Sequence, residues 1–206
     1  MVNFPKKILV ATRNKGKVRE LKDMLDGLTI DFMTLADFEK APEVIEDGAT
    51  FEDNALKKAR EIFGFSGIPT LADDSGLCVD ALDGRPGVLS ARYAGEDVPD
   101  SLRYQKILEE MREIPPDRRT ARFVCVLALV IEQDEEIVLK AECDGLITTA
   151  PIGENGFGYD PIFLYEPSGL TFAQMDKQTK NLVSHRAKAM QMLIRELKAL
   201  EATSRD

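Results

Sequence analysis

A continuous apolar run constrains the fold of this chain more than any other feature. Residues 123–131 read FVCVLALVI, with no charged side chain. A strand that is apolar at every position is covered on both faces, which is typical of sheets flanked by helices. The acidic turn at 133–136 leads into the alternating residues Ile137, Leu139 and Ala141, which predicts a hairpin. We therefore expect a long twisted mixed sheet with flanking helices, in the α/β or mixed α+β class.

Length and composition fit a globular chain with a sizeable core. The chain has 206 residues, of which 44% are hydrophobic and 31% are charged. That size accommodates one domain, either undivided or built as two lobes around a central cleft. The apolar runs are shorter than a membrane span, and the N-terminal segment lacks the apolar stretch of a signal peptide, so we expect a cytoplasmic protein.

The net charge and the cysteine positions argue against a general nucleic-acid binder and against a disulfide-rich or zinc-ribbon protein. The net charge of −9 argues against a sequence-independent grip on nucleic acid, which needs a basic face to displace counterions. An anionic substrate stays compatible with this charge if basic residues cluster locally. Cys78, Cys125 and Cys143 are odd in number, widely spaced and set in apolar segments. They predict small core residues rather than a disulfide framework or a zinc ribbon.

Adjacent acids follow a short apolar segment in the first half of the chain. Residues 68–72 predict a buried strand, and Asp73-Asp74-Ser75-Gly76 comes directly after it. An unpaired buried carboxylate costs on the order of several kcal/mol. We therefore expect the acids at the end of the strand, with a divalent metal ion neutralising them. The alternative is a surface turn, because Asp, Ser and Gly all favour turns.

A polar segment with several cations follows the first predicted strand. Residues 7–11 are mostly apolar, and residues 12–17 carry a hydroxyl, an amide and cations before helical spacing starts at Val18. Free backbone N–H groups and the macrodipole at a helix start favour a phosphate. The segment is therefore a candidate phosphate site. The alternative is a solvated loop in which Asn14 caps the helix.

A further helix is expected after an acidic loop that contains Glu46. Thr50 and Asp53 form a variant of the capping box, and the apolar face that follows consists of Phe51, Ala55, Ala59 and Ile62. Lys58 falls beside this face. A helical lysine is ordinarily solvated, so its position alone does not indicate function.

A glycine-rich segment near the C-terminus combines aromatic rings with an acid. Three glycines between 153 and 158 predict an irregular loop. Phe157, Tyr159 and Asp160 offer stacking surfaces with a hydrogen-bonding partner, a combination that recognises nucleobases. The alternative is that the rings attach the loop to the core.

Several hydrogen-bond donors precede the last predicted helix. Lys180, Asn181, Ser184, His185 and Arg186 lie at its start, where the helix dipole favours anions or carbonyl oxygens. We expect this cluster to contact a substrate, although a single histidine is often structural.

In chain order, these motifs resemble the inosine triphosphate pyrophosphatase family over essentially the whole chain. The matching segments are ATRN at 11–14 with Lys17, TF at 50–51 with NA at 54–55, ADDSG at 72–76, GRPG at 84–87, SARY at 90–93, GFGYDP at 156–161 and SHR at 184–186. Several separate motifs in one order make the resemblance specific. It implies hydrolysis of nonstandard purine nucleoside triphosphates to the monophosphate and pyrophosphate. It also implies an elongated two-lobed α/β fold, a magnesium requirement and usually a homodimer.

The resemblance implies roles for individual residues. Asp74 is the expected general base, and Glu46 and Asp74 are the expected magnesium ligands, with Asp73 close by. The residues expected at the triphosphate are Thr12, Arg13, Asn14, Lys15, Gly16, Lys17, Lys58 and Ser75. The residues expected to line the base pocket or complete its contacts are Phe157, Gly158, Tyr159, Asp160, Lys180, His185 and Arg186.

Two features of the sequence bear on which base the site selects: the donors near the last predicted helix, and the residues that differ from the family pattern. Hypoxanthine and xanthine carry a 6-oxo acceptor where adenine carries an amino donor, and His185 and Arg186 are donors that suit the acceptor. Arg13 replaces a glycine common in the family, Arg103 an asparagine and Gln174 a glutamate, which bears on fine specificity. The alternative functions are a pyrophosphatase for other modified nucleotides and a nucleotide-binding module without catalysis.

Overall fold

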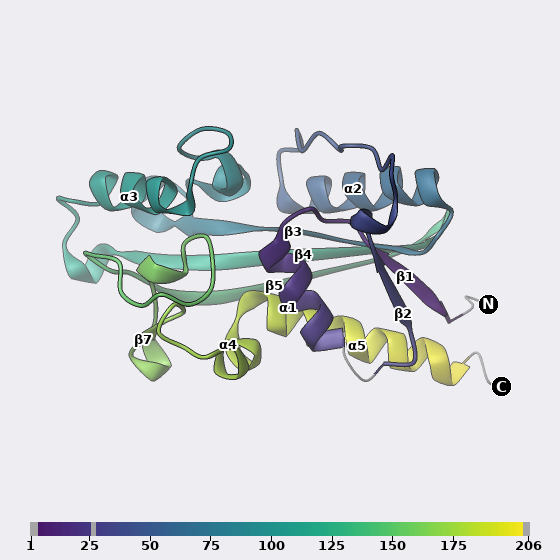
Figure 1. The fold of residues 1–206 in the computed structure, drawn as a ribbon. Coiled ribbons are helices and arrows are strands. Elements are labelled where there is room, and N and C mark those ends of the chain that lie inside the picture. The colour runs from purple at the N-terminus through teal and green to yellow at the C-terminus, as the bar shows by residue number, and fades with distance from the viewer. Residues whose placement is uncertain (1–3, 26–27, 204–206) are drawn as a thin grey trace. The chain divides into compact units, whose positions relative to one another are not determined.

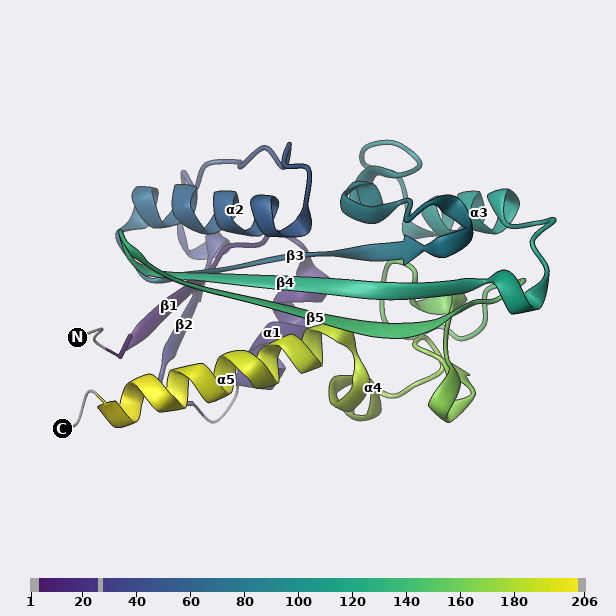
Figure 2. The same ribbon diagram turned by 180° about the vertical axis from the view of Figure 1, so that it is seen from behind.

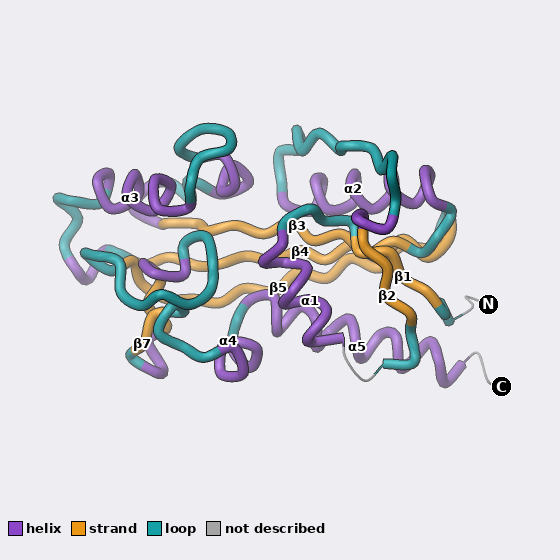
Figure 3. The backbone as a smooth tube through the Cα atoms, viewed as in Figure 1, coloured by secondary structure: helices purple, strands orange, loops and turns teal. Residues whose placement is uncertain are grey.

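The structure is a computed structural model that describes residues 4–25 and 28–203. Figures 1 and 3 show its helices and strands. In chain order they are β1 (Lys7–Val10), α1 (Lys15–Leu25), β2 (Asp31–Thr34), α2 (Phe51–Ser66), β3 (Thr70–Val79), α3 (Asp100–Glu110), β4 (Thr120–Glu132), β5 (Glu135–Ile147), β6 (Phe163–Tyr165), β7 (Leu170–Thr171), α4 (Lys177–Val183) and α5 (His185–Thr203). Short 3₁₀ turns connect several of them.

The strands form a mixed seven-stranded sheet with the order β2-β1-β3-β4-β5-β6-β7. β1 is parallel to both β2 and β3, whereas β6 is antiparallel to β5 and to β7. β4 and β5 are neighbours joined by a turn at 133–134, which confirms the predicted hairpin. The expected α/β class with a mixed sheet and flanking helices is also confirmed.

The chain divides into two compact units. Unit 1 consists of Met1–Asp74, Cys125–Ala141 and Ala187–Asp206, and unit 2 consists of Ser75–Val124 and Glu142–Arg186. The boundary falls within β3, β4 and β5, so each of these strands contributes residues to both units.

Helices cover both faces of the sheet in unit 1. α1 and α5 lie on one face and α2 lies on the other, as both ribbon views show (Figures 1 and 2). The core under α1 and α5 contains Ile8 and Val10 of β1, and the intervening residue Leu9 is buried as well. Alternate strand residues point to opposite faces, so both faces of β1 are apolar. The same holds for the β4 run, as its sequence predicts.

The core of unit 2 is built around aromatic rings. The ring of Phe123 in β4 lies 4.6 Å from that of Phe163 and 5.8 Å from that of Phe172, measured between centroids. Such offset and tilted contacts stabilise a core beyond the area they bury. All three rings are buried, and they fix the segment from β6 to β7 against β4.

Arg119 is a buried cation that holds loops of unit 2 by their carbonyl groups. Only 4% of the residue is exposed. Its guanidinium donates to the carbonyl oxygens of Met111, Ile114, Ile147 and Thr148, at 2.6 to 3.2 Å. Buried carbonyl groups need such partners because the alternative is an unsatisfied acceptor.

We expect the substitution Arg119→Met to lower the free energy of unfolding by about 3 kcal/mol, because buried carbonyls lose their donors. The control is Arg118→Met, since Arg118 is exposed and its removal should change stability by less than about 0.5 kcal/mol. Denaturant titration of both variants measures the difference. Equal midpoints for the two variants would contradict a supporting role for Arg119.

The cysteines are placed as the sequence predicts, whereas the C-terminal helices are not. Cys78, Cys125 and Cys143 are buried and unbridged, which confirms their prediction as core residues. Across the described residues, no helix is both long enough and apolar enough to cross a membrane. The prediction of one helix entered through Lys180 is wrong, because α4 and α5 are separate helices with extended backbone at Ser184.

Candidate active site

The acidic pair lies in the middle of β3 rather than at its end. The strand begins at Thr70 and continues to Val79, so the predicted strand end at Asp73 is wrong. Both acids are buried, with exposed fractions of 1% for Asp73 and 5% for Asp74. The strand continues because lysines from neighbouring helices neutralise the acids. Since successive strand residues point to opposite faces, the two carboxylates have different neighbours.

Asp73 forms an ion pair with Lys17 of α1. The Lys17 Nζ lies 2.5 Å from Asp73 Oδ1, and the Asp73 side chain is completely buried. The thiol of Cys125 in β4 donates to the other carboxylate oxygen at 3.4 Å. Both contacts hold the Asp73 carboxylate in place, and the carboxylate in turn fixes the ammonium of Lys17.

Lys58 of α2 lies between the two carboxylates expected to bind metal. Its Nζ is 2.5 Å from Glu46 Oε1 and 3.8 Å from Asp74 Oδ1, and it donates to the carbonyl oxygen of Asp73 at 2.9 Å. Only 8% of Lys58 is exposed, unlike a solvated helical lysine. Glu46, Lys58 and Asp74 therefore form one charged cluster in unit 1.

Asp74 combines a buried carboxylate with an oxygen that has no partner. Its Oδ2 is buried and accepts no hydrogen bond from the described residues. Burial raises the pKa of Asp74, the nearby Lys17 and Lys58 lower that pKa, and Glu46 raises it. A buried oxygen of this kind fits a cation or a water molecule, because leaving it unsatisfied is costly. The donor set, carboxylate oxygens alone, suits a hard cation such as Mg²⁺.

The described residues provide no complete set of protein ligands for a metal ion. Among the residues that the structure describes, no three His, Cys, Asp or Glu side chains are grouped to hold one ion. Magnesium commonly binds through one or two carboxylates and takes its other ligands from water and substrate phosphates. Glu46 and Asp74 fit that pattern.

Asn14 caps α1, and this local geometry places the predicted phosphate residues. Its Oδ1 accepts hydrogen bonds from the backbone N–H groups of Gly16 and Lys17, at 2.9 and 3.1 Å. The Asn14 N–H donates to Thr12 Oγ1 at 3.2 Å. Lys15, Gly16 and Lys17 therefore belong to the first turn of α1, and the capping alternative describes Asn14 correctly.

The remaining predicted phosphate residues differ in their surroundings. Arg13 is exposed, and its guanidinium donates to the carbonyl oxygen of Ala41 at 2.8 Å, so this departure from the family pattern anchors a loop. Lys15 is exposed, and Ser75 is partly buried in β3.

The glycine-rich loop of unit 2 folds around the carboxylate of Asp160. Asp160 Oδ2 accepts from the backbone N–H of Phe157 at 2.9 Å and from Lys180 Nζ at 2.5 Å. A Cβ on Gly156 would lie 2.0 Å from the same oxygen, and Gly156 has a φ of +77°, so only glycine fits there. The Gly158 N–H donates to the carboxylate of Asp100 at 2.7 Å.

The two aromatic rings of this loop have different environments. Tyr159 is 4% exposed, and its hydroxyl donates to the carbonyl oxygen of Ser90 at 2.8 Å, so it attaches the loop to the core. Burial raises the pKa of the Tyr159 hydroxyl well above its ordinary value. Phe157 is only partly buried. Lys180 Nζ lies 5.0 Å from the centre of its ring, and the Arg186 guanidinium carbon lies 5.7 Å from it.

Lys180, His185 and Arg186 are buried rather than displayed on a solvated helix start. Their exposed fractions are 5%, 4% and 2%, respectively. The His185 ring stacks on Phe123, with centroids 4.6 Å apart and planes 10° from parallel. Contacts with the Phe123 and Phe157 rings therefore order these donors. The structure thus groups the predicted base residues in unit 2 and the predicted phosphate and metal residues in unit 1, apart from Ser75 at the start of unit 2.

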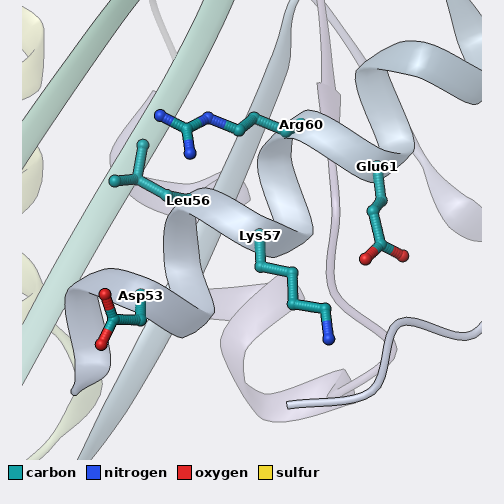
Figure 4. A pocket seen from close by; sticks show the side chains of 5 residues that line it. All are labelled: Asp53, Leu56, Lys57, Arg60 and Glu61. Carbon is teal, nitrogen blue, oxygen red and sulfur yellow. The ribbon is translucent and has the colours of Figure 1, made fainter. Parts of the chain in front are cut away.

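A surface pocket is also present on α2. It is lined by Asp53, Leu56, Lys57, Arg60 and Glu61, which project from the helix in Figure 4. None of them belongs to the predicted site. Lys57 pairs with Asp47 and Arg60 with Glu136, both at 2.6 Å, so these charges are part of surface ion pairs.

Asn54 and Asp100 are site neighbours to which the sequence had assigned no role. Asn54 is completely buried one turn before Lys58, and Asp100 accepts from Gly158. The spacing of four between Asn54 and Lys58 was the available signal, because such residues share a helix face.

Comparison with known proteins shows what family the chain represents. The model of the Ham1 family matches residues 8–196. The chain belongs to the Ham1 family. This membership confirms the resemblance read from the motifs.

Curated relatives and solved structures agree with this membership. A dITP/XTP pyrophosphatase from Geobacter sulfurreducens is 49% identical over 187 residues, covering 91% of this chain and 94% of the relative. A dITP/XTP pyrophosphatase from Geobacillus kaustophilus is 48% identical over 188 residues, covering 91% and 92%. The structure of a HAM1 protein from Coxiella burnetii matches with a TM-score of 0.86 at 39% identity, covering 94% of this chain and 98% of that protein.

Proposed function

We propose that this Ham1-family protein hydrolyses nonstandard purine nucleoside triphosphates, namely dITP, ITP, XTP and dXTP, to the monophosphate and pyrophosphate. Relatives at 49% and 48% identity carry the name dITP/XTP pyrophosphatase. The observation that carries the proposal is the buried Asp74 carboxylate. One of its oxygens has no hydrogen-bond partner among the described residues, and the ammonium of Lys58 lies 3.8 Å from the other. The whole chain, residues 1–206, acts as one catalytic domain with two lobes.

Asp74 is the general base in this proposal. Water attacks the α-phosphorus, its proton passes to the Asp74 carboxylate, and the bond to the bridging oxygen breaks so that pyrophosphate leaves. Burial raises the pKa of Asp74, which makes its carboxylate a better proton acceptor. The raised pKa must still lie below the working pH, and the ammonium groups of Lys17 and Lys58 act in that direction.

Lysines and the start of α1 bind the triphosphate. Lys17 and Lys58 neutralise negative charge on the phosphates, and the ion pair with Asp73 holds Lys17 in position. Thr12, Asn14 and Ser75 add polar contacts. Asp73 serves mainly to orient Lys17, because its carboxylate already has Lys17 and Cys125 as partners.

Glu46 and Asp74 would hold Mg²⁺ in this proposal. The bound ion would neutralise phosphate charge and polarise the phosphoryl oxygens. Lys58 now contacts Glu46, so metal binding requires the Lys58 ammonium to turn toward the substrate phosphates.

The residues of unit 2 select the base. Phe157 offers a ring face for stacking, and the Gly158 backbone, Tyr159 and Asp160 shape the loop that presents it. His185 and Arg186 supply donors for the 6-oxo group, and Lys180 fixes Asp160. A purine with an amino group at this position would leave a buried donor without an acceptor.

An assay of Mg²⁺-dependent hydrolysis tests the proposed function. With ITP, dITP, XTP, GTP and ATP as substrates, we expect the inosine and xanthosine nucleotides to be preferred over ATP by at least about 100-fold in kcat/KM. The product should be pyrophosphate, and chelation of the metal should stop the reaction. Release of inorganic phosphate, or equal use of ATP, would contradict the proposal. A panel of other modified triphosphates covers the alternative substrate class.

The proposal also covers the oligomeric state and the cellular location of the protein. We propose a homodimer, which the family resemblance implies, and a cytoplasmic location, which the lengths of the apolar runs predict. Light scattering on the purified protein measures the mass of the assembly.

A further inference from the structure

α2 presents two buried polar side chains to the acidic residues of unit 1. Asn54 and Lys58 are four residues apart, so they lie one turn apart on the same face of the helix. Their exposed fractions are 0% and 8%. Lys58 contacts Glu46 and Asp74. The phosphate contact proposed for Lys58 explains why its charge is buried at the site. Asn54 has no part in that contact, although its amide is completely buried beside Lys58.

The amide oxygen of Asn54 holds the loop that carries Glu46. Asn54 Oδ1 accepts a hydrogen bond from the backbone N–H of Gly48 at 2.8 Å. A Cβ on Gly48 would lie 2.7 Å from this oxygen and 2.6 Å from the Cβ of Asp53, so the loop approaches α2 as closely as a glycine allows. Glu46 is two residues from this contact, so the hydrogen bond restricts the backbone next to Glu46.

The amide nitrogen of Asn54 is a buried donor that finds no acceptor in residues 4–25 and 28–203. Among the described residues, both Asn54 Nδ2 and Asp74 Oδ2 are buried atoms that lack a hydrogen-bond partner. A donor and an acceptor that are both unsatisfied cost free energy unless they meet each other or share a bound water or ligand. Both side chains lie next to Lys58, because Asn54 is one helical turn from it and Asp74 Oδ1 is 3.8 Å from its ammonium. Burial raises the pKa of Asp74, and the Asn54 side chain offsets part of that rise.

We propose that Asn54 is a positioning residue that connects the Glu46 loop to Asp74, with its oxygen on Gly48 and its nitrogen directed at Asp74 Oδ2. This inference rests on the proposed function, because it assigns the purpose of the connection to metal binding by Glu46 and Asp74. The amide holds the two carboxylates at a fixed separation. With Oδ2 facing the amide, the other oxygen, Oδ1, is the one on the side of Lys58.

The substitution Asn54→Asp separates the two contacts of the amide. It keeps the shape of the side chain and an oxygen that can accept from Gly48, but it replaces the donor facing Asp74 with a second carboxylate oxygen. Asn54→Ala removes both contacts and adds no charge. Arg60→Gln is the control, because it changes the net charge by the same amount on the outer face of α2, where Arg60 pairs with Glu136.

Metal binding and hydrolysis are measured on the same purified proteins. Binding of Mn²⁺ alone, followed by electron paramagnetic resonance, should be about 10- to 100-fold weaker in both Asn54 variants, the range typical when a residue supporting metal ligands is lost. For ITP hydrolysis we expect a similar fall in kcat, with KM changed by less than about 3-fold. Arg60→Gln should match the wild type in both measurements, and thermal melting confirms that each variant is folded.

The outcomes distinguish this inference from the proposed function. Wild-type metal affinity and kcat in Asn54→Asp, with losses in Asn54→Ala, would reduce Asn54 to an anchor for the loop and overturn the inference. Unchanged values in both variants would overturn it as well. A wild-type protein that hydrolyses none of the triphosphates would refute the proposed function, whereas the Mn²⁺ affinities would still decide the role of Asn54.

Discussion

Replacing Asp74 by Asn is expected to abolish pyrophosphate release while the protein stays folded. The amide keeps the shape of the side chain but accepts no proton, and loss of a general base typically lowers the rate by about 10²- to 10⁴-fold. Because one oxygen of the proposed metal ligand is also lost, we expect the upper end of this range. Measurement of kcat with ITP at saturating Mg²⁺ gives the size of the effect.

Thermal melting separates a chemical defect in Asp74→Asn from unfolding. Burial raises the pKa of Asp74, which means that the folded protein disfavours the ionised carboxylate. A neutral amide removes that cost, so the melting temperature should equal or exceed that of the wild type. Asp117→Asn, at an exposed acid in unit 2, is the matched control and should retain full activity. Hydrolysis at the wild-type rate by Asp74→Asn would refute the role of Asp74.

Replacing Lys17 by Met is expected to produce the largest loss of stability in unit 1. The ammonium of Lys17 lies 2.5 Å from the carboxylate of Asp73, whose side chain is completely buried. Removing one partner of a buried ion pair typically costs about 3–5 kcal/mol, because the other charge stays buried without compensation. Denaturant unfolding of the variant measures this loss, and its hydrolysis of ITP should also be impaired.

A second substitution tests whether the uncompensated charge is the cause. In the double variant Lys17→Met with Asp73→Asn, the carboxylate that Lys17 neutralised is replaced by a neutral amide, so most of the lost stability should return. Activity should stay low, because the phosphate-binding cation is still absent. Lys15→Met, at an exposed lysine of the same helix turn, should change stability by less than about 0.5 kcal/mol. Additive losses in the double variant would contradict the ion-pair explanation.

Local sequence patterns determined where several strands and helices of this protein form. The apolar run at 123–131 required a strand covered on both faces, and α1, α5 and α2 provide that cover in unit 1. Thr50 and Asp53 form the capping box that their spacing predicts, and Asn14 caps α1. These features depend on residues close together in sequence, for which spacing alone specifies the contacts.

Only the tertiary structure decided how charged residues are buried. From sequence, Asp73 and Asp74 were expected to end a strand, because isolated buried carboxylates are costly. Lys17 and Lys58, from helices distant in sequence, remove that cost and allow β3 to continue. Likewise, the burial of His185 depends on Phe123, which is far away in the chain.

Asp73 and Asp74 show most clearly what the sequence determined and what the tertiary structure decided. The sequence by itself determined that Asp73 and Asp74 are adjacent and that this motif resembles that of a pyrophosphatase family. The tertiary structure made them different. Because side chains alternate along β3, Asp73 contacts Lys17 and Cys125, while one oxygen of Asp74 has no hydrogen-bond partner in the described part of the chain. The physical reason is that the free energy of a buried charge depends on groups brought together by folding, and sequence spacing does not specify those groups.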